Sequence, residues 1–222
     1  MSTAHAPIPL SRSLFVFSIL YGGMTCIAGV LAFKQVALGP LAVEAGIFAF
    51  LMLVVISSAM AQLHGQKTAN RLVLFGFVPL AVSVVLIALV LSLPPSDKMP
   101  PDNLAAFERV LSQTPRIMLA GPLAYGVSLL LNVKIFSALR GATGDGGFGV
   151  MIRGAIASAL SQTVDTLIFI TVAFYGEFPI GSLLLGQMLA KVVLSAIFVP
   201  PLIILFVKLA RRLDAPSEQP PQ

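Results

Sequence analysis

The chain has 222 residues, of which 57% are hydrophobic and only 10% are charged, and its formal net charge is +5. An average soluble domain carries about 25% charged residues. The low charge content of this chain therefore excludes an ordinary soluble fold. The composition therefore predicts an all-α integral membrane protein, in which the bilayer replaces water around most of the chain.

Six apolar stretches are long enough to cross a bilayer, which takes about 20 mostly apolar residues per helix. In chain order they are Ser13–Phe33, Leu41–Leu63, Leu72–Leu93, Ile117–Leu139, Gly154–Tyr175 and Ile180–Val207. The first is longer than a signal-peptide core of roughly 7–15 residues, so we expect it to be retained. We therefore predict a transmembrane domain of about six helices over residues 13–209, an N-terminal segment over 1–12 and a disordered tail over 210–222.

The distribution of Lys and Arg predicts the orientation, because cytoplasmic loops carry an excess of these residues. Basic residues follow the second, fourth and sixth spans: Lys67, Arg71, Arg140, Lys208, Arg211 and Arg212. Acidic residues are more frequent on the other side: Glu44, Asp97, Asp102, Glu108 and Glu177. An even number of spans also requires both ends of the chain on one side. We therefore predict that both termini are cytoplasmic.

Polar residues inside the predicted spans are candidate site residues, because ionisable groups at bilayer depth are costly. Asp165 lies near the middle of the fifth span, with Gln162 and Phe169 on the same helical face. Lys191 lies near the middle of the sixth span. Since consecutive spans are antiparallel, we expect Asp165 and Lys191 to approach and offset each other's desolvation. The two residues can belong to a transport pathway. They can also form an ion pair whose only role is to hold the two helices together.

The second and fourth spans carry further candidates. Tyr125 and Asn132 share one face of the fourth span, and Ser58 and Gln62 share one face of the second. These side chains can line a pocket or can hydrogen-bond between helices, which is worth about 0.6 kcal/mol per bond. Both interpretations stay open at these positions.

Several familiar chemical motifs are absent from the sequence or lie in the wrong context. Gly144, Gly146 and Gly149 match G-x-G-x-x-G but lack the preceding strand that a dinucleotide site needs. The sequence has no Walker A motif, no H-E-x-x-H motif and a single cysteine. We therefore predict no enzyme activity, no cofactor and no metal site. The basic residues lie between apolar spans, so we attribute them to membrane topology and expect no nucleic acid partner.

Several segments resemble the queuosine precursor transporter family, which is also described as a group of vitamin uptake transporters. The most specific is Ser161–Phe169 (SQTVDTLIF); the others include Gly65–Arg71 (GQKTANR), Thr114–Ile117 (TPRI) and Asn132–Phe136 (NVKIF). The resemblance covers roughly Ala28 to Leu209. It implies a six-helix transporter in the bacterial inner membrane that imports queuosine precursors, which are 7-deazaguanine bases, or a related small heteroaromatic compound.

The resemblance also implies a set of substrate-binding positions: Arg116, Arg153, Gln162, Asp165 and Lys191. The sequence departs from the family where acids are usual, because Ser58, Gln62 and Asn132 are neutral. A carboxylate such as Asp165 can accept two adjacent N–H groups of a guanine-like base. Gln162 and Asn132 can satisfy its remaining edges, and Tyr125 and Phe169 can pack on its ring.

Two other functions fit the same residues. The chain can be the substrate-binding subunit of a vitamin transporter driven by a separate ATPase module, for which Ala28 and Ala32 offer a small-x-x-x-small docking pair. It can also be a non-transporting membrane scaffold, in which the charged residues near the middle of the membrane only hold the helices together. The predicted partners are therefore a small-molecule substrate and the lipid bilayer, with an ATPase module or a homo-oligomer as further candidates.

Overall fold

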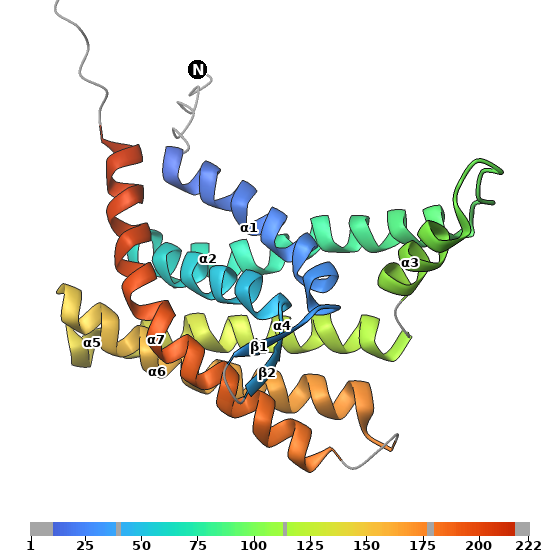
Figure 1. The fold of residues 1–222 in the computed structure, drawn as a ribbon. Coiled ribbons are helices and arrows are strands. Elements are labelled where there is room, and N and C mark those ends of the chain that lie inside the picture. Colours follow the sequence, from blue (N-terminus) through green and yellow to red (C-terminus); the bar gives the residue numbers. More distant parts are fainter. Residues whose placement is uncertain (1–10, 39–40, 113–114, 177–179, 216–222) are drawn as a thin grey trace, which may run out of the picture.

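The computed structural model describes residues 11–38, 41–112, 115–176 and 180–215. In chain order its elements are α1 Arg12–Ala32, β1 Gln35–Leu38, β2 Leu41–Glu44, α2 Gly46–Ser92, α3 Pro101–Leu111, α4 Pro115–Ala138, α5 Arg140–Thr143, α6 Gly147–Phe174 and α7 Gly181–Asp214 (Figure 1). The fold is helical apart from one hairpin, which confirms the predicted class. Residues 1–10 and 216–222, within the predicted N-terminal segment and tail, lie outside the described residues.

Five helices in the described part of the chain are long and apolar enough to cross a membrane: α1, α2, α4, α6 and α7. The sequence predicts about six spans, and the difference lies in α2. This element has 47 residues and contains both the second and the third predicted span, but it is not continuous. Gly65 interrupts it with φ 80° and ψ 166°, a left-handed conformation that costs glycine little because it has no Cβ.

The first half of α2, residues 46–64, runs antiparallel to α1. At one end of α1, the Ser13 hydroxyl lies 3.3 Å from Nε2 of His64. At the other end, Gly46 packs so closely that an added Cβ would lie 2.7 Å from the carbonyl oxygen of Ala28. This half is also the centre of the hydrophobic core, because most of its side chains are buried. It therefore forms the axis around which the other helices pack.

The second half of α2, residues 66–92, runs parallel to α1. A Cβ added to Gly22 would lie 3.3 Å from Cγ of Pro79, and one turn later Cys26 Sγ lies 3.2 Å from the Ser83 hydroxyl. The chain therefore turns back at Gly65, and Figure 1 shows α2 returning from this turn toward α3. At 1.5 Å per residue each half reaches about 28 Å or more, which is close to the thickness of a bilayer core.

The contact between α1 and the second half of α2 depends on Gly76. A Cβ at this position would come within 2.7 Å of Cδ1 of Tyr21, whose side chain is 1% exposed. We expect Gly76→Ala to lower the free energy of unfolding in detergent by about 1–3 kcal/mol, because the ring has no room to move. Circular dichroism during denaturation measures this change.

Gly23→Ala is the matched control for that substitution, because a Cβ there meets nothing within 4 Å. It should leave stability unchanged or raise it by about 0.5–1 kcal/mol, since Ala favours helix over Gly. Equal effects of the two substitutions would contradict the proposed close approach.

The start of α1 and the end of α7 meet at the same end of the molecule. The backbone N–H of Ser13 donates to Oδ1 of Asp214 at 2.9 Å, and its hydroxyl donates to Oδ2 at 2.6 Å. Helix α7 thus continues into the segment predicted as a disordered tail, and it runs through Pro200 and Pro201. Neighbouring helices and local adjustments can satisfy the backbone groups that such prolines free in membrane helices.

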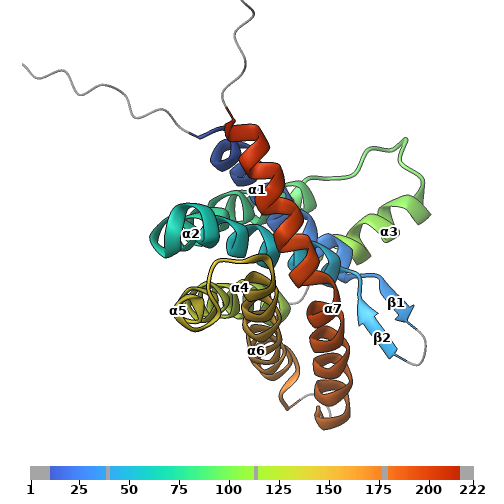
Figure 2. The same cartoon turned by 90° about the vertical axis from the view of Figure 1, so that its left-hand side faces the viewer.

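Two short elements at the opposite end were absent from the sequence prediction. The hairpin pairs β1 and β2 antiparallel, with Gln35 opposite Glu44, so the predicted second span begins later than Leu41. Helix α3 lies between the third and fourth predicted spans, where no helix was predicted, and buries none of its residues. In both views α1 and the end of α7 lie above the first half of α2, and α4 and α6 lie below it (Figures 1 and 2).

Candidate functional site

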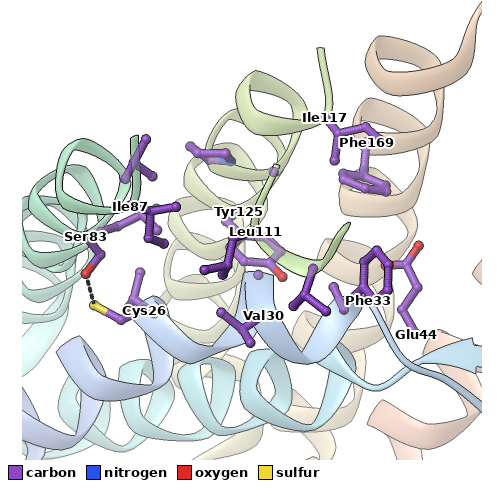
Figure 3. Close-up of a pocket in the computed structure, with 18 of the residues that line it drawn as sticks. Cys26, Val30, Phe33, Glu44, Ser83, Ile87, Leu111, Ile117, Tyr125 and Phe169 are labelled. Atoms are coloured by element: carbon purple, nitrogen blue, oxygen red, sulfur yellow. Dashed lines mark hydrogen bonds between the residues drawn. The ribbon is translucent and has the colours of Figure 1, made fainter. Parts of the chain in front are cut away.

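A cavity of about 420 Å³ lies in the half of the molecule that holds the hairpin and α3 (Figure 3). Its walls come from α1, the second half of α2, α3, α4, α6, α7 and the hairpin. This volume lies within the range of roughly 300–1,000 Å³ that is typical of small-molecule sites. Its charged lining residues are Glu44, Arg109, Asp165 and Lys191, and its aromatic ones are Phe33, Tyr125, Phe169 and Phe174.

Asp165 and Lys191 form a buried ion pair in the wall of this cavity. Lys191 Nζ lies 3.2 Å from Oδ2 of Asp165, which confirms the predicted approach of the two groups. The Ser128 hydroxyl donates to the other carboxylate oxygen at 3.2 Å. Close packing of α6 on α7 helps to set this geometry, because Gly154 leaves room for the side chain of Ile203. The carboxylate therefore has a partner on each oxygen.

Two of the predicted aromatic residues also line the cavity. The Tyr125 ring packs on Phe50 with ring centroids 4.7 Å apart, which fixes its orientation from the core side. The Phe169 ring centroid lies 5.8 Å from Nζ of Lys191, within the usual range of a cation–π contact. The cavity thus combines a compensated carboxylate with aromatic faces.

The predicted residues Gln162, Asn132 and Ser58 do not line the cavity; they are fully buried in the adjacent interior. Asn132 Nδ2 donates to the Ser58 hydroxyl at 2.9 Å. Asn132 Oδ1 and both polar side-chain atoms of Gln162 have no hydrogen-bond partner within the described protein. Gln162 lies one helical turn from Asp165 on α6, so this polar layer adjoins the cavity.

Arg153 and Gln62 lie in a separate cluster, farther along α6. Arg153 precedes Asp165 by 12 residues, or about 18 Å of helix, and its side chain is 0% exposed. Its guanidinium donates to Gln62 Oε1 and, at 3.3 Å, to Oδ1 of Asp145, and it lies 4.7 Å from the Phe136 ring centroid. Its Nε and Nη1 have no hydrogen-bond partner among the described residues.

Asp145 connects this cluster to the surface and was not predicted from the sequence. Arg140 donates to both of its carboxylate oxygens at 2.8 Å, and Gln62 Nε2 lies 3.3 Å away. The hydrogen bonds from Arg140 above all, then those from Gln62 and Arg153, lower the pKa of Asp145 to about 2. This contribution to stability is present above the ordinary carboxyl pKa and is lost as the pH falls toward 2.

Arg116 lies away from both groups, at the end of the molecule nearest α3. Its Nε donates to the carbonyl of Val172 at 3.1 Å and a terminal nitrogen donates to that of Tyr175 at 2.9 Å. It thereby connects the start of α4 to the end of α6. Its side chain is exposed and is not part of the cavity wall.

Sequence reasoning missed two charged residues of the cavity wall. Glu44 was counted only among the acidic residues of the outer side, near the start of the second predicted span, yet its Oε1 accepts a hydrogen bond from Gln187 Nε2 at 3.3 Å. Arg109 belongs to α3, an amphipathic helix of 11 residues that is too short to be predicted as a membrane span. A charged residue bordering an apolar span was the available signal in the first case.

Comparison with known proteins agrees with the resemblance in the sequence. A family model described as "Putative vitamin uptake transporter" matches residues 44–205. A "Probable queuosine precursor transporter" of Bacillus subtilis (strain 168) is 31% identical over 117 residues. That match covers 52% of this chain and 49% of the relative, so it spans about half of each protein. No solved structure matches the chain.

The family match contains most of the features described above. It begins at Glu44 and continues beyond Lys191, and so it includes the ion pair, the polar layer and the Arg153 cluster. This family consists of transporters rather than enzymes, and the long apolar helices make the chain a multi-pass membrane protein. Because the family model covers well over half of the sequence, the chain belongs to the vitamin uptake transporter family.

Proposed function

We propose that this chain imports a 7-deazaguanine-type base, or a related small heteroaromatic compound, across the bacterial inner membrane. The observation that carries the proposal is the Asp165–Lys191 pair in the wall of a cavity with aromatic faces. The family supports transport, and the relative is described as a probable queuosine precursor transporter. Asp165 and Lys191 fall within the region matched by the family model.

The chemistry of the cavity suits a planar base with N–H donors on one edge. A carboxylate can accept two parallel N–H bonds, as it does from a guanidinium group. The bound base would take the place of the Ser128 hydroxyl on Asp165, while Lys191 continues to compensate the charge. Tyr125 and Phe169 supply ring faces for stacking, which adds about 0.5–1.5 kcal/mol per aromatic pair.

The polar layer beyond the cavity supports a pathway across the membrane. Gln162, Asn132 and Arg153 all bury polar atoms that have no hydrogen-bond partner in the described protein. Each such atom costs about 1–3 kcal/mol, so packing alone does not account for them. They lie between Asp165 and the surface carboxylate of Asp145, and we infer that they contact the substrate after it leaves the cavity.

We further propose six membrane spans, with both termini in the cytoplasm. The two halves of α2 run in opposite directions along α1, and each is long enough to cross. The start of α1, the end of α7 and His64 meet at one end, which also carries most of the basic residues. This distribution supports a cytoplasmic position for that end and a position of the cavity in the outer half of the membrane, as expected for import.

The docking pair suggested for an ATPase module is used inside the protein. Ala28 is fully buried, and a Cβ added to Gly46 would lie 3.0 Å from Cβ of Ala32. These small residues therefore allow α1 and α2 to approach each other. We favour a transporter that works without a docked ATPase, and copurification of ATPase subunits from native membranes would contradict this.

Uptake by cells that lack their own importer tests the proposed function. Wild type should take up a labelled 7-deazaguanine base saturably, and Asp165→Asn should reduce the rate about 10- to 100-fold. The loss reflects a missing charged acceptor. Asp102→Asn is the control, since Asp102 lies on exposed α3 outside the cavity wall and should transport normally. Unchanged uptake by Asp165→Asn at equal membrane abundance would contradict the assignment of the site, and no uptake by wild type would favour a scaffold.

A further inference from the structure

Glu44 is a second carboxylate in the cavity, and the fold holds it in place. It ends β2 opposite Gln35, and the next backbone N–H, that of Ala45, donates to the carbonyl of Lys34 at 2.7 Å. Its neighbours Val43 and Ala45 are 2% and 8% exposed, whereas its own side chain is half-buried and lines the cavity (Figure 3). The backbone that carries this carboxylate is therefore anchored on both sides.

The charge of Glu44 has no cationic partner in the part of the chain that the structure describes. Its hydrogen-bond donor is the neutral amide of Gln187, at 3.3 Å. The two cations in the cavity wall are elsewhere: Lys191 pairs with Asp165, and Arg109 lies on exposed α3 outside ion-pair distance. The two carboxylates thus differ, because Asp165 is compensated by the protein and Glu44 is not.

Both carboxylates share the cavity with the aromatic side chain of Tyr125. Asp165, Glu44 and Tyr125 all line the same cavity, and the Tyr125 ring is held there by its packing on Phe50. A ligand whose ring packs on Tyr125 while Asp165 binds one edge would therefore place a substituent within reach of Glu44. A positively charged substituent would provide the partner that Glu44 lacks, which favours it over a neutral one in a partly desolvated site.

We propose that Glu44 determines specificity by binding a protonated amino group on the transported heteroaromatic compound. This inference rests on the proposed transport function and extends it to the charge of the substrate. Asp165 recognises the base, and Glu44 recognises the cationic substituent. The transporter then prefers a base with a short aminoalkyl group to the same base with an uncharged group of similar size.

Competition for uptake measures this preference. Cells take up a labelled 7-deazaguanine base while one of two unlabelled analogues competes, one with an aminomethyl and one with a hydroxymethyl substituent. For wild type, the inhibitory concentration of the aminomethyl analogue should be at least about tenfold lower than that of the hydroxymethyl analogue, as expected for a charge-assisted hydrogen bond. Glu44→Gln should bring the ratio of the two inhibitory concentrations close to one.

Two control variants separate this role from a structural one. Glu108→Gln removes an exposed acid of α3 outside the cavity wall, and it should keep both the uptake rate and the ratio. Gln187→Met removes the amide that holds Glu44 but leaves the carboxylate, so the preference for the amine should persist. If Glu44 only anchored the hairpin to α7, Gln187→Met and Glu44→Gln would change the ratio alike.

The outcomes distinguish the inference from the function on which it rests. Saturable uptake with the same ratio in wild type and Glu44→Gln would overturn the role of Glu44 and leave the transport function standing. A wild-type ratio close to one would overturn it as well. No saturable uptake of any of these bases by wild type would overturn both. A preference for the amine that disappears in Glu44→Gln and persists in Glu108→Gln would establish it.

Discussion

Replacing Lys191 with Met should lower the free energy of unfolding by about 3–5 kcal/mol, because it leaves a buried carboxylate without its compensating charge. Asp165 is 1% exposed, and Lys191 Nζ is 3.2 Å from its Oδ2. The Ser128 hydroxyl alone cannot replace an opposite charge. The double variant Asp165→Asn/Lys191→Met removes both charges and should recover most of the lost stability.

Denaturation in detergent micelles measures this coupling. The sequence contains no Trp, so circular dichroism of the helices is the appropriate signal. Lys134→Met is the control, since Lys134 is an exposed lysine on α4 and should change stability by less than about 1 kcal/mol. If the double variant were as unstable as Lys191→Met, the two charges would not stabilise each other. The ion pair would then not explain why a lysine is present inside the protein at position 191.

The ion pair was predictable because the information needed for it is local. Asp165 and Lys191 stand out in apolar stretches, and two consecutive antiparallel helices bring residues of similar depth together. Tyr125 and Phe169 followed from the same helical periodicity, and both line the cavity. The fold class needed only hydropathy. Residues on long helices that pack against their sequence neighbours are therefore the part of the site that sequence reasoning reaches.

The cavity wall outside these helices depends on tertiary structure. Glu44 enters it through a hairpin, whose apolar strand cannot be told from the start of a helix by hydropathy. Asp145 reaches Gln62 and Arg153 only after the α5–α6 connection folds back over the end of the first half of α2. Arg153 and Gln62 were predicted together with Asp165, but about 18 Å of helix separates Arg153 from it. Periodicity predicts the helical face on which a residue lies. Its depth relative to residues on other helices depends on how the helices pack, which the sequence pattern does not contain.

The two buried cations among the described residues, Lys191 and Arg153, should respond to substitution in opposite ways. Lys191 has a buried carboxylate beside it, whereas Arg153 has only the exposed Asp145 and the amide of Gln62. Two nitrogens of its guanidinium have no partner within the described residues. Desolvation of a charge can exceed the energy of an imperfect pairing, so apolar replacements of similar volume are often neutral or stabilising by about 1–4 kcal/mol. Arg153 therefore carries a cost that Lys191 does not.

Arg153→Met should accordingly keep or raise the free energy of unfolding by about 1 kcal/mol, because Met fills the site and retains contact with the Phe136 ring. The same substitution should reduce uptake at least about tenfold, since the buried charge lies on the proposed inner half of the pathway. Arg140→Met is the matched control: it contacts the same Asp145 from the exposed side and should alter stability and uptake little. A variant Arg153→Met that unfolds readily but transports at the wild-type rate would mean that Arg153 serves packing. A stable protein that no longer transports would mean that the chain retains a costly buried charge because its substrate needs it.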